Sequence, residues 1–400
     1  MIATPACIRL PREIVDFITE DLKDEKKTLK ACCLISRSAD IWAASCRAHL
    51  FKDITVHVHE PERSLVEFIR FLEAAPFIAE QVERLCLRKT DVYFAQYPLT
   101  TSVVRKREVY GTRHPVDAFV VRNLLDKLPR LTQLSLQRLY CALTEGSNVT
   151  HADSNVKFKL KILKYRPEIT DLAPLDGFLQ ILALFSEVDE LRFQESPLPK
   201  CSPPSEGPKI NLPKISSLIF EDANHMQALA RDILCIASLR TLGMPLALTA
   251  ASEIEFKAML TQYGQELCNL QIVLCDLQDT IRQEKWRDMH VDRLTSLKSV
   301  TFITSSSLYM YQDRYHLPSI TNCLGVVPSA GISQINLIPT VPKYLVDYDH
   351  QSWEDWAYPY FSSKASAQFD EVCHKLPSLQ KVFWGWTIGH DVEDVDKLQW

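Results

Sequence analysis

Apolar and polar residues alternate along most of this chain in a pattern that predicts a repeated strand. The pattern is Φ-x-x-Φ-x-Φ, where Φ is an apolar residue and x is any residue, and it often follows a helical segment that ends in Leu-Pro. Successive copies are separated by 49, 29, 28, 27, 24, 28, 30, 35 and 47 residues. The ten copies begin at Val82, Leu131, Leu160, Val188, Ile215, Leu239, Leu267, Leu297, Ile332 and Leu379.

Helical spacing of apolar residues fills the gaps between these strands. It occurs at 121–128, 179–185, 229–236 and 254–263, and the stretch before the first copy adds a strand over 54–58 and a helix over 64–73. Strands that alternate with helices are typical of parallel pairing, because each helix carries the chain back to the start of the next strand. The fold class is therefore predicted to be α/β.

Residues 10–51 follow a different pattern, that of three short helices. Leu10, Ile14, Phe17, Ile18 and Leu22 share one helical face, followed by a second apolar set from residue 29 and a third from residue 41. About 40 residues bury too little surface to fold alone. These helices therefore need the rest of the chain or a partner.

The same residues resemble an F-box of the fungal type, the helical module that docks on the S-phase-kinase-associated adaptor of SCF-type cullin-RING ubiquitin ligases. The motif L-P-x-E-I occupies residues 10–14, and S-C-R-A-H-L-F occupies residues 45–51. Four residues separate the Ser36-Arg37 pair from Trp42, which indicates a short insertion before the third helix. The resemblance implies an adaptor-facing surface made of Leu10, Pro11, Ile14, Leu22, Leu29, Ile35 and Trp42.

The remainder is similar to a leucine-rich repeat, because six consecutive intervals lie between 24 and 30 residues. The eighth position of that repeat is usually Asn or Cys. Here six copies have a hydroxyl or a thiol, so the repeats are degenerate. They are Thr90, Ser196, Cys275, Ser305, Thr340 and Thr387. We therefore predict an F-box at 8–52 and an irregular solenoid of about nine or ten units at 53–400.

The repeats suggest a target-binding face and three loops. Polar residues between the inward apolar positions are the first candidates to contact a target, namely Arg192, Glu221, Gln271, Thr301 and Asn336. Loops are predicted near 100–116, 196–213 and 343–361. The last contains Trp353 and Trp356 among acidic residues, which fits either an interface anchor or a cap over the end of the core. A further predicted strand has lysines at alternate positions, namely Lys157, Lys159 and Lys161. They would form either an anion-binding strip or a row of solvated lysines.

Composition and charge bear on the partners, the membrane insertion and the cellular compartment expected for this protein. A net charge of −5 in 400 residues favours neither nucleic acid nor an anionic membrane as a partner, and no apolar run is long enough to span a membrane. The N-terminus lacks a secretory signal pattern. The twelve cysteines include no C-x-x-C pair and are expected to be reduced thiols. A cytoplasmic or nuclear location, or both, is expected.

Motifs for chemistry are missing from the sequence. There is no phosphate-binding glycine loop, nucleophile elbow or zinc-protease motif, and His57 and His59 lack further metal ligands nearby. No catalytic residue, metal or cofactor is therefore predicted. The expected function is a substrate receptor that binds the adaptor, the cullin scaffold and an unknown protein target. An interaction scaffold without a link to ubiquitination, and an enzyme with a dispersed site, are the alternatives.

Overall fold

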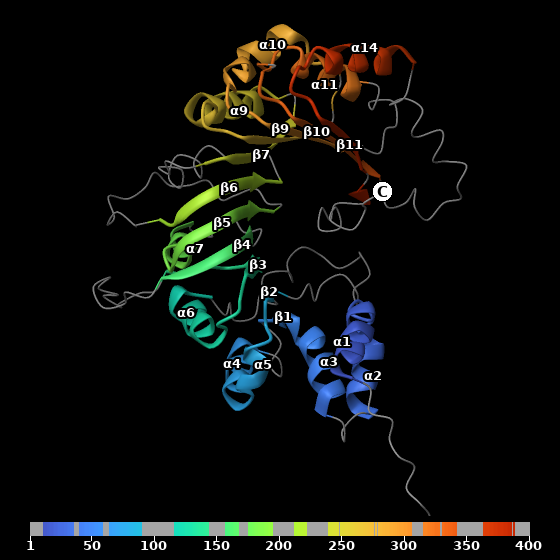
Figure 1. The fold of residues 1–400 in the computed structure, drawn as a ribbon. Coiled ribbons are helices and arrows are strands. Elements are labelled where there is room, and N and C mark those ends of the chain that lie inside the picture. Colours follow the sequence, from blue (N-terminus) through green and yellow to red (C-terminus); the bar gives the residue numbers. More distant parts are fainter. Residues whose placement is uncertain are drawn as a thin grey trace, which may run out of the picture. The chain divides into compact units, whose positions relative to one another are not determined.

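The computed structural model describes residues 11–35, 40–58, 64–89, 116–143, 157–167, 175–194, 212–221, 239–247, 249–275, 277, 279–305, 315–328, 330–341, 363–385 and 387–388. They belong to two compact units (Figure 1). The first unit comprises Met1–Glu168 and Ala173–Ser186, and the second comprises Ile169–Leu172 and Glu187–Trp400. The predicted loops near 100–116, 196–213 and 343–361 lie almost entirely outside the described residues, as do Trp353 and Trp356.

The first unit begins with the three predicted helices and continues as a parallel sheet with helical crossovers. Strands β1 to β4 pair in chain order, and all three pairings are parallel. Its elements are α1 (Arg12–Asp21), α2 (Lys26–Ile35), α3 (Asp40–Lys52), β1 (Asp53–His57), α4 (Leu65–Ala74), α5 (Pro76–Ala79), β2 (Arg84–Arg88), α6 (Ala118–Lys127), β3 (Gln133–Leu139), β4 (Phe158–Pro167) and α7 (Leu175–Leu182).

The second unit continues the same alternation of strand and helix. Strands β5 to β11 follow in chain order, and β12 pairs with β10 beyond the end of β11. The predicted helix at 229–236 falls outside the described residues. The elements are β5 (Phe185–Phe193), β6 (Lys214–Phe220), β7 (Thr241–Ala247), α9 (Ala250–Tyr263), β8 (Asn269–Cys275), α10 (Gln283–Asp288), the 3-10 helix η3 (Val291–Arg293), β9 (Ser299–Ser305), α11 (His316–Leu324), β10 (Gln334–Val341), α14 (Ser363–His374), β11 (Lys381–Trp384) and β12 (Thr387–Ile388).

Three helices begin where the sequence supplies a capping side chain. Ser64 Oγ accepts a hydrogen bond from the Glu67 N–H at 3.3 Å before α4, and Asp117 Oδ1 accepts one from Val120 at 2.8 Å before α6. Thr249 plays the same part before α9. Each cap satisfies a backbone donor that has no partner inside the helix.

The apolar repeat predicted from the sequence is confirmed by burial. All three apolar positions of the first nine copies are buried, and most are fully excluded from solvent. Strands β2, β3 and β7 to β11 each begin two residues after the first apolar position. The last copy differs, because Val382 at its second apolar position is 37% exposed.

A recurring backbone arrangement aligns neighbouring strands. The carbonyl of the residue just before a strand accepts two consecutive N–H groups from the next strand along the sheet. Cys268 O, for example, accepts from Lys298 N at 2.8 Å and from Ser299 N at 3.1 Å. The same arrangement fixes equivalent positions side by side at five other carbonyls, those of Glu83, Thr132, Arg240, Lys298 and Ser333.

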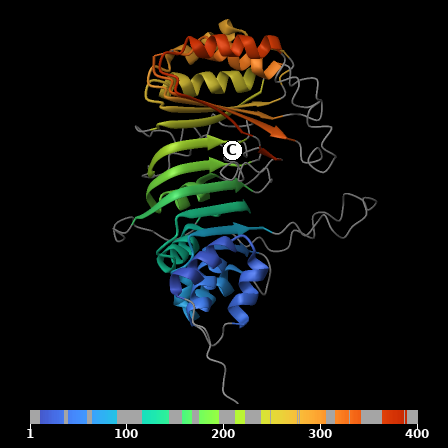
Figure 2. The same ribbon diagram turned by 45° about the vertical axis from the view of Figure 1, so that its right-hand side comes forward.

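Described helices of the second unit cover the apolar face of its sheet. In Figures 1 and 2, α9, α10, α11 and α14 lie together on one side of strands β7 to β11. The rings of Phe256 in α9 and Trp286 in α10 meet edge-on at 6.5 Å, and Phe369 in α14 meets Trp384 in β11 at 6.0 Å. The core therefore lies between these helices and the leucine-bearing side of the sheet, and alternate strand residues form the opposite face.

Buried polar groups tie α10 and α11 together. Ser319 Oγ accepts a hydrogen bond from the Ile281 N–H at 2.9 Å, and the Trp286 indole N–H donates to Ser319 O at 3.0 Å. His316 lies at the start of α11 with 1% exposure, and burial lowers the pKa of its imidazole to about 4. The described cysteines are all free thiols.

We expect replacement of a fully buried apolar residue to cost far more stability than the same change at the last repeat. Val300 and Val382 occupy the same position of the repeat, with 0% and 37% exposure. Val300→Ala should lower the free energy of unfolding by about 2–3 kcal/mol, because it removes two buried methyl groups and leaves a cavity. Val382→Ala should cost below about 1 kcal/mol. Equal shifts of the two denaturant midpoints would contradict this account of the core.

Acid should weaken the second unit through His316. Because burial lowers its pKa from 6.5 to about 4, the folded state keeps the imidazole neutral while the unfolded chain protonates it. The free energy of unfolding should thus fall as pH drops from 6.5 to 4, by up to on the order of 3 kcal/mol. His316→Leu should remove this part of the pH dependence, and His374→Leu, at an exposed helical position, should retain it. Chemical denaturation across this pH range measures both.

Candidate protein-interaction surfaces

Helix α1 packs through small side chains and presents large ones to solvent. Val15 and Thr19 are buried, and the Thr19 hydroxyl donates back to Val15 O at 3.0 Å. Ile14 is 46% exposed and Phe17 is 67% exposed, one helical turn apart on the same side. The predicted apolar stripe of α1 is therefore largely turned away from the protein interior.

Helices α2 and α3 supply the rest of the interior of the three-helix module. Leu29 and Cys46 are fully buried, Ala43 is 6% exposed, and the Ser45 hydroxyl donates to a carboxylate oxygen of Asp16 in α1. Small residues on α3 let the helices approach closely. This packing stabilises the module without using the large side chains of α1.

The structure divides the seven predicted adaptor-facing residues. Pro11, which directly precedes α1 as its N-cap, is exposed together with Ile14, and Leu22 and Trp42 are partly exposed. Leu29 belongs to the module interior, so its surface is not presented to a partner in this arrangement. Leu10 and the side chain of Ile35 lie outside the described residues.

Two exposed apolar residues were missing from that predicted surface. Phe17 and Leu34 are 67% and 53% exposed. Phe17 lies on the same helical stripe as Ile14, so the spacing alone could have identified it. Leu34 follows the predicted apolar set of α2, of which Leu29 is buried and Cys32 and Cys33 are partly exposed.

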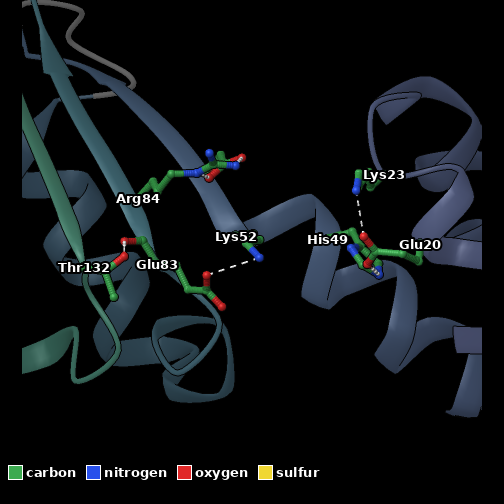
Figure 3. Close-up of polar contacts among 8 residues, drawn as sticks. Glu20, Lys23, His49, Lys52, Glu83, Arg84 and Thr132 are labelled. Atoms are coloured by element: carbon green, nitrogen blue, oxygen red, sulfur yellow. Dashed lines mark hydrogen bonds and ion pairs between the residues drawn. The ribbon is translucent and has the colours of Figure 1, made fainter. Parts of the chain in front are cut away.

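The module joins the first sheet without a linker, since α3 ends at Lys52 and β1 begins at Asp53. Figure 3 shows the polar contacts on both sides of this junction. Glu83 N donates to Lys52 O at 3.0 Å, and the Lys52 ammonium lies 3.2 Å from the Glu83 carboxylate. The predicted boundary at residue 52 thus coincides with a change of element inside one compact unit.

Glu20 links α1 to α3 within the module (Figure 3). Its carboxylate lies 2.8 Å from Lys23 Nζ and 3.9 Å from His49 Nε2. The hydrogen bond from Lys23 lowers the pKa of Glu20. Glu20 and Lys23 are exposed and His49 is partly buried, so these contacts contribute little to stability.

In the second unit, the face opposite the leucines carries two polar rows, which we call the polar face. Strand register places residues of each row side by side. The first row is Glu190, Ser217, Thr241, Asn269, Ser299, Gln334 and Lys381. The second row is Arg192, Ile219, Gly243, Gln271, Thr301, Asn336 and Phe383.

Side chains on the polar face bond to one another along and between the rows. The Asn269 amide donates to Thr241 Oγ1 at 3.0 Å, and the Asn336 amide donates to Thr301 Oγ1 at 2.9 Å. Glu190 pairs with Arg192, so those two charges compensate each other. The polar face therefore consists mainly of hydrogen-bonded amides and hydroxyls with one compensated ion pair, and Ile219, Gly243 and Phe383 interrupt its second row.

Four of the five predicted target-binding residues on strands come together in the second row. They are Arg192, Gln271, Thr301 and Asn336, all partly exposed. Glu221 lies just past the end of β6, where its N–H donates to Phe193 O at 2.9 Å, so it belongs one step further along the same face. Sequence reasoning missed the first row, although its members occupy the same place in each repeat.

Within the described ranges, no group of three or more His, Cys, Asp or Glu residues is placed to hold a metal ion. His57 lies on β1, and His59 is outside the described residues. None of the helices that the structure describes is long and apolar enough to cross a membrane.

Comparisons with known proteins identify no family for this chain. No family model matches it, and no curated protein is similar to it in sequence. Among solved structures, it is similar to the leucine-rich repeat-containing protein LegL7 from Legionella pneumophila, with 12% identity and a TM-score of 0.42 over 84% of this chain and 90% of that chain.

We expect the exposed residues of α1 to be dispensable for folding. Ile14→Ala combined with Phe17→Ala should change the free energy of unfolding by less than about 1 kcal/mol, because both side chains stay largely solvated when the chain folds. Leu29→Ala should cost about 2–5 kcal/mol. Thermal and denaturant unfolding of the purified chain compare the two variants, and a larger loss for the α1 pair would show that α1 is packed the other way round.

Proposed function

We propose that this protein is a non-catalytic receptor, whose N-terminal helices dock on the S-phase-kinase-associated adaptor of a cullin-RING ubiquitin ligase and whose repeats bind a target protein. The proposal joins the F-box resemblance of residues 10–51 to the two surfaces described above. The receptor would act by proximity, holding the target near a ubiquitin-charged enzyme and so raising the local concentration of the reacting groups. The ligase chemistry itself would belong to the partner proteins.

The observation that carries this proposal is the outward placement of Ile14 and Phe17. They lie on α1, directly after the Leu-Pro pair of the resemblance, and their exposed fractions are 46% and 67%. A helix that has already packed through Val15 and Thr19 gains nothing internally from two large apolar side chains on its other side. Burial against a partner would remove their apolar surface from water.

The direct junction of α3 and β1 fits a docking module that is built into the first unit. The contacts between Lys52 and Glu83 hold the first sheet against the docking helices.

The polar face of the second unit is our candidate for target binding. Its ordered amides and hydroxyls can both donate and accept hydrogen bonds, as the main chain and polar side chains of a protein target require. Arg192, Gln271, Thr301 and Asn336 are the residues to substitute first, because they share one row.

An interaction scaffold without ubiquitination is a second candidate, favoured by the region around Trp42. Four residues separate it from the Ser-Arg pair, and in the structure its side chain is partly buried in the first turns of α3. Co-purification separates the two candidates, since a receptor should bring down adaptor and cullin together.

Charge placed on α1 should abolish adaptor binding. Ile14→Asp with Phe17→Asp would put carboxylates into an apolar contact, so the dissociation constant for the purified adaptor should rise at least about a hundredfold. The matched control is Val66→Asp with Phe119→Asp, at residues 57% and 67% exposed on α4 and α6. Pro11→Ala with Ile14→Asp tests the same surface. Unchanged affinity of the α1 variants, measured by calorimetry, would refute the docking role.

A further inference from the structure

The sheet of the first unit also has a face opposite its buried rows, and its chemistry differs from that of the polar face. Leu85, Leu134 and Leu163 share one register row in the core, as do Leu87, Leu136 and Tyr165. Strand residues alternate between the two faces. The residues between these rows therefore lie on the other side of β1 to β4.

At the carboxyl end of this side, register places four residues in one row, which we call the basic row. They are His57, Arg88, Gln137 and Arg166 on β1, β2, β3 and β4. Arg88 is exposed, and His57, Gln137 and Arg166 are partly exposed. Lys164 lies in the row before, on the same face, and is buried.

Acid groups on this face are few among the described residues. Asp53 is the one carboxylate in the described rows of this face of β1 to β4, and it pairs with Arg84 through two hydrogen bonds. That pair lies two rows before the basic row. It also shows a guanidinium of this sheet binding a carboxylate in the two-pronged geometry that Arg favours.

We propose that the basic row binds an acidic segment, rich in Glu or Asp, of a protein partner in extended conformation. This goes beyond the proposed function, because it concerns different residues and does not require the adaptor. Arg88 and Arg166 supply forked donors, and Gln137 between them can donate to or accept from the peptide main chain. His57 and Arg166 also make interactions within the chain.

The spacing of the basic row suits several separate carboxylates. Neighbouring strands lie about 4.8 Å apart, so the row extends about 14 Å from β1 to β4 and its two arginines are about 10 Å apart at their Cα atoms. In an extended peptide, side chains on one side recur about every 7 Å, within reach of two long guanidinium side chains. A single phosphate would instead need donors that converge on one point.

The amount of charge also favours an acidic peptide over a nucleic acid. Nucleic-acid surfaces need many phosphate contacts spread over a broad basic area, and the whole chain carries a net charge of −5. The basic row carries two arginines, with His57 neutral. This matches a short acidic segment.

The test uses the full chain and fluorescence anisotropy with two labelled peptides of equal length, one rich in Glu and one with Gln at the same positions. We expect the Glu peptide to bind at least about tenfold more tightly than the Gln peptide at low salt and to weaken as salt is added. Arg88→Glu with Arg166→Glu should remove that preference. Arg88→Glu alone, at an exposed position, should reduce it, which guards against misfolding of the double variant.

The matched control is Lys257→Glu with Lys375→Glu, which changes the net charge equally at two exposed lysines, one on α9 and one directly after α14. It should keep the preference for the Glu peptide. The proposal would be overturned if the control lost the preference for the Glu peptide while the arginine variants kept it. Equal binding of the two peptides by the unmodified chain would also overturn it, as would tighter binding of a single-stranded oligonucleotide than of the Glu peptide. Adaptor binding by every variant is measured in parallel, so failure of the basic row is distinguishable from failure of the docking helices.

Discussion

Alignment of the parallel strands depends on a single backbone arrangement that recurs from repeat to repeat. The carbonyl before one strand accepts two consecutive N–H groups from the next, as Cys268 O does from Lys298 and Ser299. Parallel strands can otherwise slip relative to one another, and a slip by one residue would exchange the two faces of the sheet. The doubled acceptor holds equivalent positions side by side, and the apolar positions then bury together under the helices.

This constraint also creates the surfaces on the other side of each sheet. Once the apolar positions point toward the helices, the residues between them must line the opposite face in continuous rows. In the second unit that face is an array of amides and hydroxyls with compensated charges, whereas in the first unit it ends in His57, Arg88 and Arg166. The same repeat pattern therefore presents two different sets of side chains, and the residues between the apolar positions decide which set each unit carries.

The N-terminal helices form a small packed module and leave large apolar side chains on its surface. Val15 and Thr19 of α1 fill the interior with little volume, and Leu29 of α2 supplies the large buried side chain. Ile14 and Phe17 keep their apolar surface in contact with water, which is unfavourable, and burial against a binding partner would remove that surface from water. The direct connection from α3 to β1 makes this module part of the first unit.

The sequence by itself determined the strands and which of their residues face the core. Each repeat buries the same three positions, and the alternation of apolar and polar residues along a strand is a local property of the sequence. It could not determine which residues become neighbours across strands. Arg192, Gln271 and Asn336 share one row only through backbone bonds between segments about thirty residues apart, and Glu221 lies one step further along the same face. For α1 the helical spacing predicted an apolar stripe but not what covers it. Only tertiary packing decided that Leu29 lies inside while Phe17 faces water, because the close approach of α1 and α3 selects the small side chains for their interface.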